Sequence, residues 1–186
     1  HGSIGTGKAG SSSGLTNIDG FVSQTMWSSN PFPIDSDSLS MGAGYSYVKA
    51  FTEGQSGSVV QDSIILLWTG EPVIVKTAGP DTFVIPDDDN AGETWRFTVT
   101  DRLGHPLSAG TTISISSPHA TPTTDANVTL GDTFRTGDGI TSFYVQLEDA
   151  YPNDTKSAPD QCVLQVVVVH PVYGTYRLTL ATGQVY

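Results

Sequence analysis

The sequence is short of cysteine, of charged residues and of long hydrophobic runs. Its 186 residues include a single cysteine, Cys162, so no disulfide can form within the chain, which excludes a disulfide-stapled module. Charged residues make up only 15%, against an ordinary fraction of about 25%. No apolar stretch approaches the roughly 20 residues of a membrane span. We therefore expect no membrane insertion of this segment.

Positive charge is scarcer still. Eight Lys and Arg residues stand against nineteen Asp and Glu residues, which gives a net charge of −11. A protein that binds nucleic acid needs clustered cations to neutralise phosphates, and the few cations of this chain are scattered along it. We therefore expect no nucleic-acid partner and no attraction to an anionic membrane surface.

The chain is instead rich in Gly, Pro, Thr and Ser, and its apolar residues alternate with polar ones. Trp95, Phe97 and Val99 fall on one face of an extended segment, a period of two that indicates a half-buried strand. Residues 101–104 have the composition of a tight turn, in which Gly104 can take a positive φ. Helical periodicity is absent, so the pattern predicts an all-β protein.

The pattern also divides the chain into a tail and two units. Residues 1–14 are predicted to be a flexible linker or tag-like tail, and 79–186 contain seven strands, enough for an immunoglobulin-like β-sandwich of about 100 residues. Residues 15–78 contain three or four strands, too few for a sandwich. Either the sequence begins inside a domain, or the missing strands come from another chain or from the second unit. The predicted strands are 20–28, 45–52, 59–69, 82–85, 93–100, 111–116, 126–130, 140–148, 162–170 and 174–181.

Two stretches resemble bacterial immunoglobulin-like domains of the invasin and intimin type. Residues 97–113 are similar to the family's hydrophobic strand, followed by Val-x-Asp-x-x-Gly-x-Pro and a Gly-Thr that leads into the next strand. Residues 19–22 and 44–50 resemble the later half of such a domain, where Asp-Gly opens a strand and Gly-x-Tyr-x-Val-x-Ala precedes the final hairpin. The resemblance implies tandem immunoglobulin-like β-sandwiches, with 15–78 the C-terminal part of one domain and 79–186 a more complete second one.

The resemblance also implies a function. It points to a non-catalytic extracellular, periplasmic or cell-surface module that serves as a structural spacer or adhesion segment of a bacterial surface protein or lipoprotein. The implied partners are neighbouring immunoglobulin-like domains of the same protein, and a surface protein or glycan. The family has no catalytic residues to carry over, so we expect no enzyme. The alternative is a carbohydrate-binding accessory module, for which Trp27 and Phe32, near a proline-stiffened loop, are the candidate ligand contacts.

An acidic loop is the strongest candidate metal site. Residues 87–93 contain four carboxylates and an amide, and Ca²⁺ binds several oxygens presented by a flexible loop. The spacing is not that of an EF-hand loop, because Ala91 stands at the fifth position. We expect no cofactor other than weakly bound Ca²⁺ at Asp87, Asp89 and Glu93. A solvated loop on an acidic surface is the simpler interpretation.

Residues typical of hydrolases are present without the arrangement that hydrolysis needs. Residues 10–14 match G-x-S-x-G, but they lie in a low-complexity stretch without the strand and helix of a nucleophile elbow. His105, His119 and His170 occur singly beside prolines, which predicts solvated or singly hydrogen-bonded loop residues. Cys162 lies in an alternating strand, where it is expected to be a small buried hydrophobe. A hydrolase is the third interpretation, and it requires two close carboxylates in a deep pocket.

Overall fold

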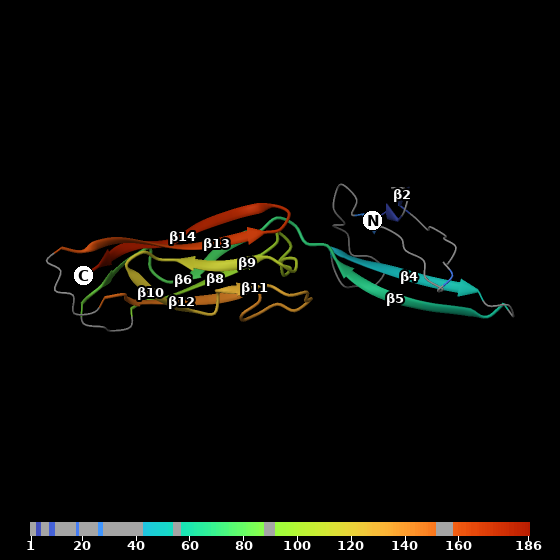
Figure 1. Cartoon of the computed structure of the whole chain (residues 1–186), viewed down its shortest axis with the longest axis horizontal. Helices are drawn as coiled ribbons and strands as arrows, with labels where there is room; N and C mark the ends of the chain where they lie inside the picture. The colour runs from blue at the N-terminus through green and yellow to red at the C-terminus, as the bar shows by residue number, and fades with distance from the viewer. Residues whose placement is uncertain are drawn as a thin grey trace. The chain divides into compact units, whose positions relative to one another are not determined.

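Figure 1 shows the computed structural model, in which every regular element is a β-strand among the residues that it describes. The contacts divide the chain into His1–Trp68, here called unit 1, and Thr69–Tyr186, here called unit 2. The prediction of an all-β protein is confirmed. The described residues are 3–4, 8–9, 18, 26–27, 43–53, 57–87, 92–151 and 158–186.

Unit 1 is dominated by one long hairpin. Its strands β4 (Tyr45–Glu53) and β5 (Val59–Leu67) pair antiparallel over their whole length. Gly57 takes a φ of +73° in the connection between them, as the glycine-rich sequence there predicts for a hairpin. Three two-residue strands, β1 (Ser3–Ile4), β2 (Lys8–Ala9) and β3 (Met26–Trp27), form a second small sheet.

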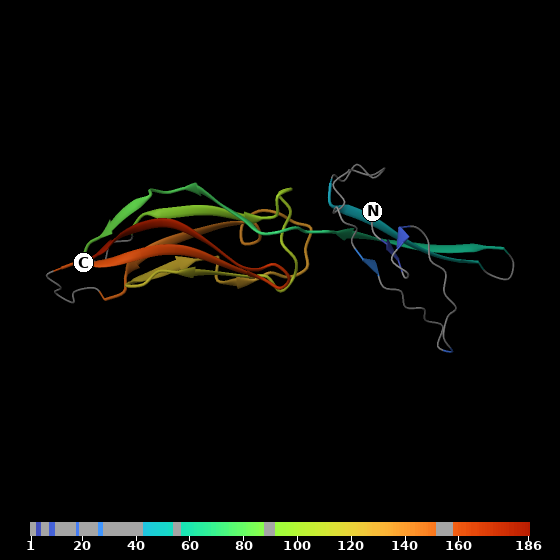
Figure 2. The same cartoon turned by 90° about the horizontal axis from the view of Figure 1, so that it is seen from above.

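Unit 2 is a sandwich of two sheets, seen edge-on in Figure 2. One sheet has the strand order β10-β12-β8-β6, and the other has the order β11-β9-β13-β14-β7. The strands are β6 (Val73–Ala78), β7 (Thr82–Ile85), β8 (Thr94–Thr100), β9 (Thr112–Ser116), β10 (Ala120–Thr124), β11 (Val128–Thr129), β12 (Ser142–Asp149), β13 (Asp160–His170) and β14 (Gly174–Val185).

The strand order of unit 2 is that of an immunoglobulin-like sandwich. The first strand, β6, pairs with β8 in one sheet, and the chain then crosses over so that β7 pairs parallel with the last strand, β14, in the other sheet. The two sheets correspond to the four-stranded and the three-stranded layers of that fold, the second one extended here by β7 and β11. The predicted β-sandwich is therefore observed in unit 2.

The segment Val73–Ala78 belongs to unit 2, although the sequence-based boundary after residue 78 assigned it to the first unit. Its residues pair with β8, in which Val73 lies opposite Thr100. Gly79 and Pro80, which suggested a domain boundary, instead form the crossover that carries the chain from one sheet to the other. The contacts accordingly place the division between Trp68 and Thr69.

Lys76 holds this crossover in place. Its ammonium donates hydrogen bonds to the carbonyl oxygens of Pro80 (2.7 Å) and Leu180 (2.9 Å) and to the carboxylate of Asp81 (2.5 Å). The three donors of the ammonium are thereby used, and β6 of one sheet is tied to β14 of the other. The hydrogen bond and the charge of Lys76 also lower the pKa of the exposed Asp81 carboxyl.

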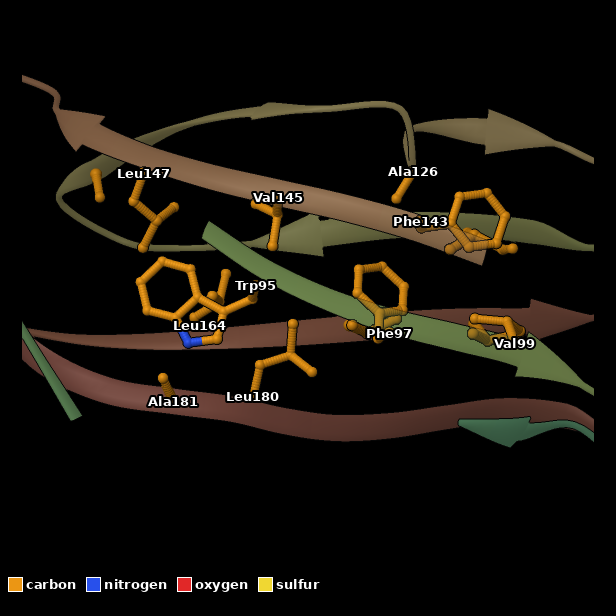
Figure 3. Close-up of a cluster of buried hydrophobic side chains, with 14 of the residues drawn as sticks. Trp95, Phe97, Val99, Ala126, Phe143, Val145, Leu147, Leu164, Leu180 and Ala181 are labelled. Carbon is orange, nitrogen blue, oxygen red and sulfur yellow. The ribbon is translucent and has the colours of Figure 1, made fainter. Parts of the chain in front are cut away.

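The core of unit 2 lies between the two sheets (Figure 3). Trp95, Phe97 and Val99 have no solvent exposure, as the alternation of the sequence predicts. The Phe97 ring stacks on Phe143 of β12 at a centroid distance of 5.7 Å. Cys162 is buried on β13, and this burial raises the pKa of its thiol to about 11. The prediction that Cys162 is a buried hydrophobe is therefore confirmed.

Candidate functional site

Buried polar side chains gather at one end of unit 2, the end at which β6 begins, here called the entry end. β8 and β13 finish there, and β9 and β14 start there, because Thr100 lies opposite Val73 and His170 opposite Gly174. Among the described residues, the buried polar or charged residues are Asp101, Thr111, Thr141, Asp149 and His170, of which all but Asp149 lie at this end.

At this end the Asp101 carboxylate accepts several hydrogen bonds. One of its oxygens accepts hydrogen bonds from the backbone N–H groups of Leu103 (2.8 Å) and His105 (2.9 Å). The other oxygen accepts a hydrogen bond from the Gly70 N–H (3.2 Å) and lies 3.3 Å from the His105 Nδ1. The turn closes through Gly104, whose N–H donates to the Asp101 carbonyl and whose φ is +84°. The predicted turn with a positive φ at Gly104 is confirmed.

This geometry ties the chain that enters β6 to the turn that follows β8. Gly70 precedes β6, and its hydrogen bond to Asp101 bridges residues that are 31 positions apart in sequence. An ion pair between Arg102 and Glu71 (3.3 Å) spans the same two segments. Both of its side chains are mostly exposed, so it contributes little stability. Of these two contacts, the buried Asp101 carboxylate is therefore the stronger attachment.

A serine and a histidine also meet at the entry end. The Ser108 Oγ lies 3.0 Å from the His170 Nε2, and only 3% of His170 is exposed. The other ring nitrogen, Nδ1, faces the backbone N–H groups of Val172 (3.1 Å) and Tyr173 (3.2 Å). The pair is the arrangement within the described residues that comes nearest to a nucleophile with its base.

The protonation state of His170 argues against catalysis by this pair. Backbone N–H groups only donate, so the Nδ1 atom of His170 must accept, and the ring proton is on Nε2. The Nε2–H group therefore donates to Ser108 and cannot remove the serine proton, as a general base would have to. Burial also lowers the pKa of His170, which favours this neutral form. The pair joins the loop before β9 to the end of β13.

The buried, neutral state of His170 predicts a loss of stability on acidification. Below the ordinary histidine pKa of about 6.5, the unfolded chain binds a proton that the folded protein does not bind. The stabilisation from His170 is thus present above that pH and is lost as the pH falls toward the lower pKa of the folded state. We expect His170→Asn to show a smaller loss of unfolding free energy between about pH 7 and pH 5, measured by urea denaturation.

Asparagine is the informative replacement for His170. Its side-chain oxygen can accept the hydrogen bond that the Val172 N–H donates, and asparagine has no titrating group. Equal pH dependence in the two proteins would contradict the assignment. His105 keeps its contact with Asp101, and His119 its contact with Asp160 (3.2 Å), in both proteins, so their effects cancel in the comparison.

The predicted metal and ligand residues fall partly outside the described residues. Asp87 is half-buried and Glu93 is exposed, whereas Asp89 and Phe32 lie outside the described part of the chain. Trp27 belongs to β3, but its side chain is not among those described. In the described part of the chain, no three His, Cys, Asp or Glu side chains converge as a metal site needs. The weak Ca²⁺ site and the Trp27 contact stay predictions.

The prediction that His170 is a solvated or singly hydrogen-bonded residue is wrong. His170 is buried and has three hydrogen-bond partners, one of them 62 positions away in sequence. A signal for this was present, because His170 continues the inward-facing series of β13 at a spacing of two. The preceding inward residues are Cys162, Leu164, Val166 and Val168.

No protein-family model matches the chain, and no curated protein matches it in sequence. Two solved structures overlap with most of it. Domains 4 and 5 of the S-layer protein SbsC align with 91% of this chain and 87% of their own, at 13% identity and a TM-score of 0.38. The longer fragment rSbsC(31-844) aligns with 92% of this chain and 25% of its own, at 12% identity and a TM-score of 0.36. Overlap at this level assigns neither the fold nor the function of this chain.

The described residues contain no helix with the length and apolar character that crossing a membrane would require.

Proposed function

We propose that this chain is a non-catalytic structural spacer or adhesion segment of a bacterial surface protein or lipoprotein, located outside the cell or in the periplasm. The neighbouring domains of the same protein are its first partners. The similarity of residues 97–113 to bacterial immunoglobulin-like domains supports this proposal. In unit 2, Asp101 of this stretch closes the turn after β8 and accepts a hydrogen bond from Gly70 of the incoming chain.

One observation carries the proposal: the two ends of the unit 2 chain lie at opposite ends of the sandwich. Val73 starts β6 at the entry end, opposite Thr100. The last strand starts at the same end, where Gly174 pairs with His170, and runs to Val185 at the far end (Figure 1). A unit with this geometry transmits a pull along its length, as a spacer must.

The hydrogen bonds between β7 and the last strand, β14, suit that task. β7 and β14 run parallel, with Thr82 opposite Thr182 and Ile85 opposite Val185. When unit 2 is pulled at its two ends, these neighbouring strands are drawn in opposite directions along their own axes. The hydrogen bonds between them are then loaded together rather than one after another. The inert Ser108–His170 pair also favours a structural role over a hydrolytic one.

Single-molecule pulling tests the spacer function. We expect the full chain held at Thr69→Cys and Tyr186→Cys to unfold unit 2 at a higher force than the chain held at Thr69→Cys and Val172→Cys. Val172 is 78% exposed and lies in the turn between β13 and β14 at the entry end. Pulling at Thr69 and Val172 therefore separates the strands one hydrogen bond after another, starting from the entry end. Forced unfolding reports the barrier along the chosen direction.

The native Cys162 is buried and does not compete with the engineered handles in the folded protein. Equal unfolding forces in the two geometries, or a higher force for the pair at the entry end, would argue against a load-bearing spacer.

A further inference from the structure

A hollow of about 270 Å³, lined by both polar and apolar atoms, lies on the outer face of the β12–β8 sheet. Tyr144 of β12 and Arg96 of β8 are direct cross-strand partners, and both are exposed on this face. The strands around them alternate, with Phe143 and Val145 buried in the core. The hollow is lined by Arg96, Asp125, Asp138, Ser142, Phe143 and Tyr144.

One wall of the hollow is fixed by hydrogen bonds to the backbone of Tyr144. The Asp125 Oδ1 accepts a hydrogen bond from the Tyr144 N–H (2.9 Å), and the Thr124 hydroxyl donates to the Tyr144 carbonyl (2.5 Å). The Ala126 N–H in turn donates to the Thr124 hydroxyl (3.0 Å). The Asp125 carboxylate is therefore held at the rim of the hollow by one of its oxygens.

Another part of the lining is a tight turn that carries Asp138. The carbonyl of Gly137 accepts hydrogen bonds from the N–H groups of Ile140 (3.2 Å), Thr141 (2.9 Å) and Ser142 (2.9 Å). The Gly137 N–H donates to the Thr141 hydroxyl (2.8 Å). Gly137 has a φ of +120°, which few other residues could adopt. Both carboxylates are thus presented by ordered backbone, and little conformational entropy is lost when a ligand binds them.

We propose that this hollow is a binding site for a neutral sugar with adjacent hydroxyl groups. The Tyr144 ring offers an apolar surface for the C–H face of a pyranose. The two carboxylates accept hydrogen bonds from hydroxyls, and the Arg96 guanidinium donates to sugar oxygens. A few fixed polar groups around an aromatic surface are what orients a small ligand in a protein pocket. This site goes beyond the spacer function and does not rest on it.

The charges of the hollow favour a neutral sugar over an ion. Asp125 and Asp138 together with Arg96 leave an excess of one negative charge, in a chain with a net charge of −11, which repels anionic ligands. A hard cation such as Ca²⁺ needs six or more oxygen ligands, and the adjacent guanidinium opposes it. A hydroxyl-rich ligand uses both the acceptors and the donor.

Saturation-transfer NMR on the full chain tests the site. The probes are glucose, galactose, mannose and N-acetylglucosamine, each at millimolar concentration. We expect at least one of them to receive saturation from the wild-type protein and to lose it in Tyr144→Ala. Asp125→Asn keeps an oxygen that can accept a hydrogen bond from the Tyr144 N–H, but it removes the charge and replaces the second acceptor oxygen by an amide donor. It should weaken the affinity by about tenfold, as for one charge-assisted hydrogen bond.

The matched control is Tyr186→Ala, because Tyr186 is 38% exposed and Tyr144 is 36% exposed, and Tyr186 follows β14 away from the hollow. Binding that persists in the control and disappears in Tyr144→Ala supports the proposal. Absence of saturation transfer for every probe, or equal signals in the two tyrosine variants, overturns it.

Discussion

Replacing Trp95 by alanine is expected to lower the free energy of unfolding of unit 2 by about 3–5 kcal/mol. Its side chain has no solvent exposure and packs edge-to-face on Phe83, with the ring centroids 5.3 Å apart. The indole N–H donates a hydrogen bond to the Pro80 carbonyl (2.8 Å). A Cβ at Gly79 would lie 2.4 Å from the indole ring, so the crossover rests directly on Trp95. Alanine would leave a cavity beneath this crossover.

Thiol labelling of Cys162 provides a measurement that is specific to unit 2. The thiol is buried in the folded sandwich and becomes reactive when the unit opens. The urea midpoint of labelling should fall by roughly 2 M in Trp95→Ala, given a slope near 2 kcal/mol per M.

Two further variants serve as comparisons for Trp95→Ala. Trp95→Phe should lower the free energy of unfolding by less than Trp95→Ala. Most of the apolar contact is kept, and the Pro80 carbonyl still accepts a hydrogen bond from the Lys76 ammonium. Val84→Ala is the surface control, because Val84 is 63% exposed on β7. It should change stability by less than about 0.5 kcal/mol. A midpoint for Trp95→Ala equal to that of Val84→Ala would contradict the central place of Trp95 in the core.

The sequence predicts the centre of the sandwich well because a period of two is a direct consequence of strand geometry. All seven strands predicted in the second unit are present, and 82–85 has the predicted bounds. The turn at 101–104 is also predictable, since only a few residue types can take the required backbone angles. These features depend only on residues that are close together in the sequence, so they can be predicted from it.

Elements whose place depends on distant contacts could not be predicted in the same way. The Gly79-Pro80 pair indicates a break, but the same chemistry serves a domain boundary and a crossover between sheets. β10 was missed because Pro122 interrupts its pattern. The structure places Pro122 on the outer strand of its sheet, where a missing N–H group costs nothing.

The same limit applies to the functional residues. Ser108 and His170 meet only through the pairing of β9 with β13, and no spacing in the sequence links them. The hollow on the β12–β8 sheet combines Asp125 and Asp138 from two different loops that precede β12, and they do not form a motif in sequence. By contrast, Asp101 belongs to a motif that was recognised, although its hydrogen-bond partners were not predictable from it.

Asp101→Ala is expected to lower the free energy of unfolding of unit 2 by about 3 kcal/mol, because several N–H groups lose their acceptor at once. Three of these groups are in the backbone, at Gly70, Leu103 and His105, and the carboxylate that serves them is 1% exposed. Urea unfolding followed by Cys162 labelling measures the loss. Asp132→Ala removes an exposed carboxylate from a loop of the same unit and should leave the midpoint nearly unchanged.

Asp101→Asn distinguishes the hydrogen bonds within the turn, to Leu103 and His105, from the hydrogen bond to Gly70. Its side-chain oxygen can still accept from Leu103 and His105, so the turn should survive, with a loss of about 1 kcal/mol. Its amide group would face the Gly70 N–H, and two donors cannot bond to each other. Amide hydrogen exchange at Gly70 should therefore accelerate in both Asp101 variants, while exchange at Leu103 accelerates only in Asp101→Ala. Unchanged exchange at Gly70 in Asp101→Asn would show that the incoming chain is held by another contact.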